Sequence, residues 1–180
     1  MSIRYAILGF LSWRAYTGYE LKKCFADALS FHWSGNNNQI YGTLVSLHKE
    51  GAVTLDIQPQ EKLPARKVYT ITESGRQELK SWLVAESELP ILRSEFNVRL
   101  AWACGLSGKE LLEMVGSYER QLAAQVLMYK EKARRGFQAP DRTDLERRLW
   151  NSIEAHAIAF YERELEWVVS LKSEVGENKE

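Results

Sequence analysis

The chain has 180 residues, of which 45% are apolar, so it can form one compact domain or two small ones. Its formal net charge is zero, which argues against a general polyanion-binding protein. The two halves differ, however, because residues 1–84 carry 10 Lys and Arg against 7 Asp and Glu, whereas residues 85–180 carry 14 against 17. A basic first half suits a contact with DNA, although an imbalance of this size is weak evidence by itself.

Several classes of protein are excluded by what the chain lacks. It shows no signal-peptide pattern and no apolar run near the ~20 residues that span a bilayer, so we expect a cytoplasmic protein with no membrane partner. Cys24 and Cys104 lie in apolar contexts and are expected to be buried, reduced thiols. No nucleophile elbow, P-loop, zinc-protease or dinucleotide-binding motif is present. We therefore expect no catalytic residue, no metal site, no cofactor and no enzymatic activity.

The first elements in chain order read as helices. Residues 3–13 are mostly apolar and predict a short core helix. Thr17 is a suitable N-cap for a second helix, in which Leu21, Phe25 and Leu29 recur every four residues and so share one face. The Gly- and Asn-rich stretch 34–38 predicts a turn that leads into the next helix.

The third helix and the two strands after it are the most informative segment. Over residues 38–50, Ile40, Leu44 and Leu47 form a core-facing stripe, and Gly51 is placed to end the helix. Residues 53–57 alternate apolar and polar side chains, and residues 66–72 are rich in β-branched and aromatic side chains, so both predict strands of a hairpin. This order of elements is the layout of a winged helix-turn-helix.

A fourth helix is predicted after Thr72, which can cap it, with Leu79, Trp82 and Leu83 on the inner face. We therefore predict a winged-helix DNA-binding domain over residues 1–84, consisting of three helices, a two-stranded wing and this linking helix. Residues 85–89 are polar and precede Pro90, so they predict a linker.

The remainder is predicted to be wholly helical, which makes the fold class mainly α. Capping boxes at Ser107-x-x-Glu110 and Thr143-x-x-Glu146 each open a long helix, and each helix is about 42 Å long at roughly 28 residues. Apolar stripes as wide as those on the two helices usually pack against another chain, so residues 90–175 are predicted to form a helical dimerisation domain. An intramolecular hairpin that buries the same faces is the alternative. Residues 176–180 are predicted to be a disordered tail.

Taken together, residues 1–83 resemble the PadR family of bacterial transcription regulators. The resemblance rests on these segments, in this order and spacing: Tyr5-Ala6-Ile7-Leu8-Gly9-Phe10-Leu11, Gly18-Tyr19-Glu20-Leu21, Gln39-Ile40-Tyr41-Gly42-Thr43-Leu44 through Leu47, Gly51-Ala52-Val53, and Arg66-Lys67-Val68-Tyr69-Thr70-Ile71-Thr72-Glu73-Ser74-Gly75. The helical remainder is similar to the larger C-terminal domain of one branch of that family. One departure is Gly42, where many members have proline, and this glycine loosens the first turn of the helix.

The resemblance implies a homodimer that binds double-stranded DNA at an operator and usually represses, and it implies a small aromatic effector that releases the DNA. The candidate DNA-binding residues lie on the third helix and on the basic hairpin, where amide, hydroxyl and cationic groups can contact bases or phosphates. They are Asn36, Asn37, Asn38, Gln39, Tyr41, Thr43 and Ser46 on the helix, and Lys62, Arg66 and Lys67 on the hairpin.

Structural alternatives exist for each of these groups. The Asn run is also suited to capping a helix and making a turn, Tyr41 to burial with a satisfied hydroxyl, and the hairpin cations to keeping an edge strand soluble. The six tryptophans suit an aromatic pocket, but each is better explained as core or dimer interface, so no effector site is named. A winged-helix module that binds another protein rather than DNA remains the rival function.

Overall fold

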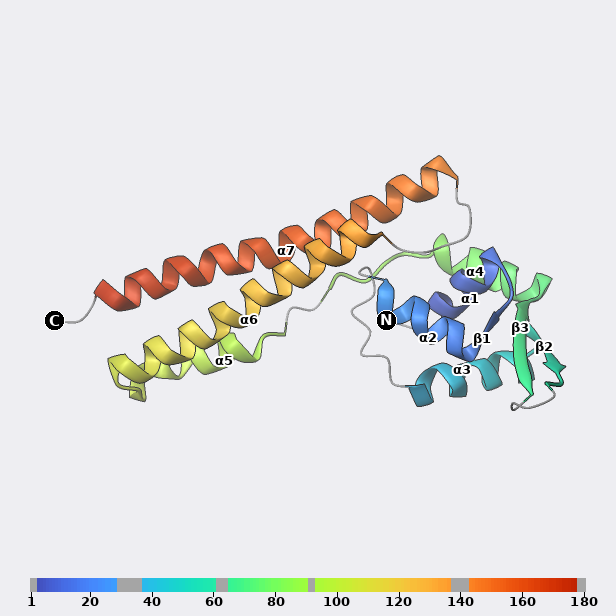
Figure 1. The fold of residues 1–180 in the computed structure, drawn as a ribbon, viewed down its shortest axis with the longest axis horizontal. Helices are drawn as coiled ribbons and strands as arrows, with labels where there is room; N and C mark the ends of the chain where they lie inside the picture. The colour runs from blue at the N-terminus through green and yellow to red at the C-terminus, as the bar shows by residue number, and fades with distance from the viewer. Residues whose placement is uncertain (1–2, 29–36, 61–64, 91–92, 137–142, 178–180) are drawn as a thin grey trace. The chain divides into compact units, whose positions relative to one another are not determined.

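The computed structural model describes residues 3–28, 37–60, 65–90, 93–136 and 143–177 (Figure 1). The chain divides into two compact units, the first reaching to Glu88 and the second beginning at Leu89. Within the described ranges the secondary structure is helical apart from three short strands, so the prediction of a mainly α fold with an N-terminal winged helix is confirmed.

The first two helices of unit 1 form where the sequence pattern placed them. Helix α1 (Ile3–Trp13) buries Ile7, Leu8, Phe10 and Leu11, and α2 (Gly18–Asp27) buries its own apolar face against it. A capping box fixes the start of α2: Thr17 accepts from the Glu20 amide at 3.1 Å, and the Glu20 carboxylate accepts from the Thr17 amide at 2.7 Å.

Helix α3 (Asn37–Lys49) follows and ends at a glycine stop. Gly51 has φ of +77°, a left-handed conformation that glycine adopts without strain. Its amide donates to the His48 carbonyl at 3.1 Å, and the Ala52 amide donates to the Leu47 carbonyl at 2.9 Å. This pair of bonds is a Schellman motif, so the predicted helix end is confirmed.

The sheet contains one more strand than the sequence predicted. Strands β2 (Val53–Gln58) and β3 (Arg66–Ile71) form the expected antiparallel hairpin, with Val53 opposite Ile71 and Gln58 opposite Arg66. A two-residue strand, β1 (Tyr16–Thr17), pairs with the other edge of β3 and gives the order β1-β3-β2. A strand this short has no alternation to read, so the two-stranded wing is confirmed and the third strand of the sheet is an addition that the sequence did not predict.

The last helix of unit 1, α4 (Glu73–Leu83), begins as expected at Thr72, whose hydroxyl oxygen accepts from the Gly75 amide at 3.2 Å. Its C-terminal end differs from the prediction: Leu83 is 65% exposed, and Trp82 is half-exposed and stacked on Tyr5 with ring centroids 4.5 Å apart. Figure 1 shows α3 below α1 and α4 above it.

Unit 2 is a long helical hairpin with a short helix packed beside it. It consists of α5 (Glu95–Ala101), the 3-10 turn η1 (Ala103–Gly105), α6 (Gly108–Arg135) and α7 (Asp144–Glu177). Both predicted capping boxes are formed, because the Ser107 and Thr143 amides donate to the Glu110 and Glu146 carboxylates at 2.8 and 2.9 Å. No described helix combines the length and apolarity needed to cross a bilayer.

The core of unit 2 joins α5, α6 and α7. Its buried members are Phe96, Val115, Leu122 and Val168, and Phe96 stacks on Tyr118 with ring centroids 4.0 Å apart. Lys130 on α6 and Glu162 on α7 form an ion pair, with Nζ and Oε1 2.6 Å apart. Cys24 in unit 1 is buried as expected, but Cys104 is exposed because η1 places it on the surface, so that prediction was wrong.

Candidate nucleic-acid interface

Helix α3 separates apolar and polar residues between its two sides. Ile40, Leu44 and Leu47 are each 0% exposed. The side chains of Asn38, Gln39 and Ser46 are exposed, and Thr43 is half-buried. The helix therefore buries one face in unit 1 and presents amide and hydroxyl groups on the other. Asn37 is its first residue, whereas Asn36 and Lys62 lie outside the described residues.

Tyr41 lies on the exposed side and packs against the start of α2. Its side chain is 46% exposed, so the alternative of a buried tyrosine is wrong. The ring lies against Gly18 so closely that a Cβ at that position would be 2.4 Å from Tyr41 Cε1. Glycine at position 18 therefore allows α3 and the start of α2 to come together with the Tyr41 ring between them.

Ser46 and the end of α3 are held by an ion-pair network. The Ser46 hydroxyl donates to Glu50 Oε1 at 2.6 Å, and Arg4 Nη1 contacts Glu50 Oε2 at 2.7 Å. Arg4 also binds Glu78 on α4 through Nε and, at 2.7 Å, through Nη2. The hydrogen bonds from Ser46 and Arg4 hold the pKa of Glu50 below its ordinary value. This network ties α3 to both α1 and α4.

The two described cations of the wing lie in different environments. Lys67 is exposed and has no ion-pair partner among the residues that the structure describes. Arg66 is also exposed, but its Nη2 lies 3.4 Å from both carboxylate oxygens of Glu20. The pairing of β1 with β3 brings the start of β3 to the start of α2, which makes this contact possible.

Glu20 is the centre of a cluster that sequence reasoning missed. Besides capping α2 at Thr17, its Oε1 lies 3.3 Å from Nη1 of Arg14, whose guanidinium centre lies 3.8 Å from the centroid of the Tyr16 ring. Burial by itself would raise the pKa of Glu20, but the hydrogen bonds from Thr17 and Arg14 outweigh burial and hold that pKa below its ordinary value. The available signal was the Thr17-x-x-Glu20 spacing, which is that of a capping box.

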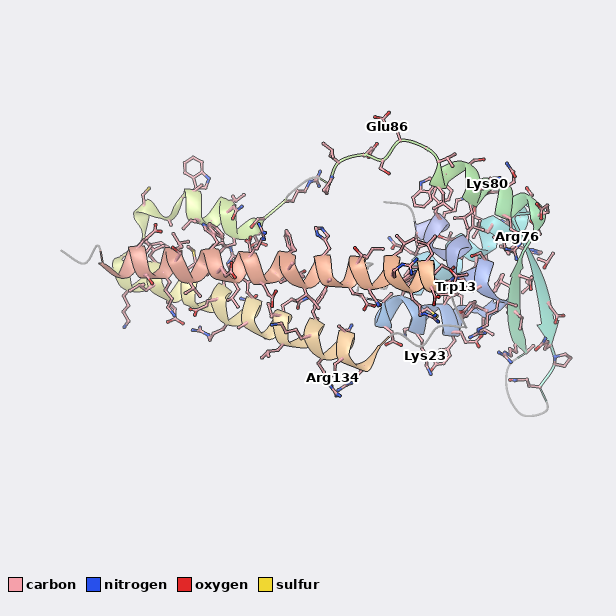
Figure 2. The ribbon with its side chains drawn as sticks, turned by 90° about the horizontal axis from the view of Figure 1, so that it is seen from above. Trp13, Lys23, Arg76, Lys80, Glu86 and Arg134 are labelled. Carbon is pink, nitrogen blue, oxygen red and sulfur yellow. The ribbon has the colours of Figure 1, made fainter. Side chains whose placement is uncertain are left out.

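The exposed side of α2 adds further cations that the sequence analysis did not select. Lys22 and Lys23 are both exposed, and Figure 2 labels Lys23 on this helix. The ammonium of Lys23 lies 4.9 Å from the centroid of the Tyr19 ring. Adjacent lysines on a helix do not reveal from sequence alone which side faces solvent, and only the packing of α2 shows it.

None of the described tryptophans is fully buried, so of the two expected roles, core or dimer interface, the core role is wrong and the dimer interface stays a prediction. Trp82, Trp102 and Trp167 are 47%, 79% and 39% exposed, whereas Trp13 and Trp150 are half-buried. Trp33 lies outside the described residues. Tryptophan exposed on this scale is more typical of an interaction surface than of a core.

Comparison with known proteins agrees with this geometry. Residues 7–81 match the model of the transcriptional regulator PadR-like family. The chain is 32% identical over 138 residues to the negative transcriptional regulator PadR of Bacillus subtilis (strain 168). The aligned residues cover 68% of this chain and 76% of that protein.

Solved structures show the same fold. The structure of Bacillus subtilis PadR in complex with operator DNA has a TM-score of 0.83 at 25% identity and covers 96% of this chain and 98% of that one. Bacillus subtilis PadR in complex with p-coumaric acid gives a TM-score of 0.76 at 24% identity, over 97% and 95% of the two chains. These relatives are transcriptional regulators, which confirms the prediction that the chain is not an enzyme. The chain belongs to the PadR-like family of transcriptional regulators.

Proposed function

We propose that this regulator is a homodimeric, cytoplasmic repressor that binds a pseudo-palindromic operator through α3 and the wing of each protomer. The observation that carries this proposal is the division of α3 into a fully buried apolar face and an exposed face of amide, hydroxyl and phenol groups. A helix of this kind fits the major groove, and Asn38 and Gln39 can each pair with an adenine there. Lys67 supplies a positive charge for a phosphate.

An exposed apolar stripe on α7 supports the dimer. Leu145, Leu149, Ile153, Phe160 and Trp167 are between 39% and 58% exposed, and their spacings of four and seven residues place them on one face. Val168, on a neighbouring face of α7, is fully buried and packs with Val115 and Leu122 of α6. Contiguous exposed apolar surface usually marks an interface, and a second copy of unit 2 offers the same stripe for a two-fold contact.

An aromatic effector is the remaining part of the proposal. Bacillus subtilis PadR has been solved both with operator DNA and with p-coumaric acid. We propose that a small aromatic molecule likewise releases this protein from its operator.

A footprint on the DNA upstream of the protein's own gene tests the function. We expect protection of a pseudo-palindrome at low salt, steep weakening as salt rises, and loss of protection with a planar aromatic compound from a panel. Lys67→Gln should weaken binding to all sequences about equally, whereas Gln39→Ala should relax specificity at one base pair of each half-site.

A winged-helix module that binds another protein is the second candidate, which the zero net charge of the chain favours. The same experiment separates the two. A purified protein that leaves the upstream DNA unprotected at low salt would exclude the repressor and favour the protein-binding module.

A further inference from the structure

Two arginines from separate elements share one carboxylate at the start of α2. Arg14 lies between α1 and β1, and Arg66 is the first residue of β3. Arg14 Nη1 and Arg66 Nη2 lie 3.3 and 3.4 Å from the same oxygen, Oε1 of Glu20. Two donor nitrogens within reach of one oxygen are close enough to donate together to a single phosphate group.

The charges in this cluster do not cancel. Two guanidinium groups face one carboxylate, so one positive charge is left over. Both oxygens of Glu20 are already engaged, because Oε2 accepts from the amide and hydroxyl of Thr17 at 2.7 and 2.8 Å while Oε1 faces the arginines. The Glu20 side chain is 27% exposed, compared with 48% for Arg14 and 47% for Arg66. The anionic member is therefore the least accessible of the three, and the cationic members face solvent.

Both arginines also have N–H donors left to bind a further anion. Among the described residues, Arg14 uses Nη1 for Glu20 and for the Ala15 carbonyl at 3.0 Å, and Arg66 uses Nη2 for Glu20, whereas each guanidinium has five N–H donors. At 3.3 and 3.4 Å these contacts are long for charge-assisted hydrogen bonds, which typically measure about 2.7–2.9 Å. Long ion pairs between half-exposed side chains contribute little stability, so a phosphate can compete for the remaining donors without a large cost.

We propose that Arg14 and Arg66 together bind one phosphate of the DNA backbone, and that Glu20 positions both guanidinium groups for it. The proposal rests on the proposed DNA-binding function and adds Arg14 as a contact residue and Glu20 as a positioning residue. A phosphate at this place fixes the register of the protein on the duplex without reading a base. It also gives Arg66 a partner shared with the body of unit 1, so the wing and α2 bind the backbone at the same point.

The test measures binding of the full-length protein to two duplexes of equal length, the upstream DNA and a scrambled sequence, over a range of salt concentrations. Arg14→Gln should weaken both by the same factor, about a hundredfold, because each of the two protomers loses one charge-assisted hydrogen bond worth about tenfold. The slope of log affinity against log salt should become shallower by up to about 1.8 per dimer, because the variant cancels the one net positive charge of each cluster and a phosphate contact contributes about 0.9.

Lys80→Gln is the matched control. Lys80 is an exposed cation on α4, on the other side of α1 from α3 (Figures 1 and 2). Lys80→Gln removes one positive charge from unit 1, as Arg14→Gln does, and should leave the slope of log affinity against log salt unchanged. If Arg14→Gln and Lys80→Gln behave alike while the wild type binds, the phosphate site is wrong and the DNA-binding function stands. If the wild type binds neither duplex at low salt, both proposals fall together.

A double-mutant cycle tests whether the two arginines share one phosphate. For a shared site, Arg14→Gln combined with Arg66→Gln should cost less than the product of the two single losses, because either change already weakens the same contact. Losses that multiply would mean separate phosphates and would overturn the shared site. Thermal unfolding checks that each variant is folded, and Arg14→Lys, which keeps the charge but not the planar fork, replaces Arg14→Gln in the cycle if the latter does not fold.

Discussion

Gly75 tests the packing that fixes the base of the wing to α4. It is buried in the first turn of α4, and a Cβ at this position would lie 2.2 Å from the carbonyl oxygen of Ala52 and 2.9 Å from Cγ1 of Ile71. That carbonyl also accepts a hydrogen bond from the Thr72 amide at 3.0 Å. Gly75→Ala therefore forces backbone atoms apart at the point where the hairpin leaves and rejoins the helices.

The size of the effect follows from three contributions. Overpacking against backbone typically costs about 1–3 kcal/mol, and weakening the hydrogen bond between Thr72 and Ala52 adds about 0.5–1.5 kcal/mol. Alanine recovers up to about 1 kcal/mol relative to glycine in a helix. The expected net loss in the free energy of unfolding is about 2 kcal/mol, which lowers the urea midpoint by about 1 M for a typical dependence on urea.

Gly42→Ala provides the matched control for the same chemical change. Gly42 lies inside α3, and a Cβ there meets no described atom within 4 Å. This variant should gain about 0.5–1 kcal/mol in the free energy of unfolding. Urea unfolding followed by circular dichroism measures both variants, and amide exchange of the peptide that contains Thr72 reports the local contact. If Gly75→Ala is as stable as Gly42→Ala, the close approach at Ala52 does not exist in solution.

Three other variants test the site, the helical hairpin and the dimer. Gly18→Ala should displace the Tyr41 ring, because the added carbon would lie 2.4 Å from it. That ring is half-exposed and can swing aside, so the free energy of unfolding should change by less than about 1 kcal/mol while affinity for the operator falls. Unchanged affinity in a filter-binding assay would show that the position of the ring is unimportant. Burial raises the pKa of Tyr129 from 10.0 to about 12, so the neutral phenol is the form that the folded state favours; its contribution to stability is complete below pH 10 and is lost as pH rises towards 12. Urea midpoints over this range should therefore fall more steeply for the wild type than for Tyr129→Phe, and parallel curves would contradict the raised pKa. Ile153→Glu should convert the dimer to a monomer in sedimentation experiments whereas Ala155→Glu, also exposed on α7, should not, and a dimer that survives Ile153→Glu would exclude the apolar stripe as the interface.

The helices were predictable because their signals are local. The stripe of Ile40, Leu44 and Leu47, the stop at Gly51 and the cap at Thr72 each depend on residues within one or two turns. The structure confirms all three because backbone donors and acceptors at helix ends must be satisfied by whatever lies nearby.

Features that depend on distant pairings were not predictable. Strand β1 exists only because β3 lies beside it, and the contact of Arg66 with Glu20 follows from that pairing across 46 positions. The exposure of Leu83 has the same origin: its helical spacing indicated an inner face, but the described residues leave this side chain 65% exposed. Periodicity shows which face of a helix is apolar and does not show whether another element is present to cover it.

The predicted contact residues on α3 remain predictions, since exposure alone does not distinguish a base contact from a solvated side chain. The structure does narrow their possible roles. Ser46 is already bonded to Glu50, whereas the Tyr41 ring lies against Gly18 and is 46% exposed.

The peptide at Ala52 receives both ends of the β2–β3 hairpin, because it follows the stop of α3 directly and its carbonyl accepts from Thr72 where α4 begins. The hairpin is thus fixed at its base by backbone hydrogen bonds, which do not depend on the side chains farther along β2 and β3. Changes in the length or charge of the hairpin can therefore arise without changes in the helices. A longer or differently charged hairpin could be grafted onto this domain.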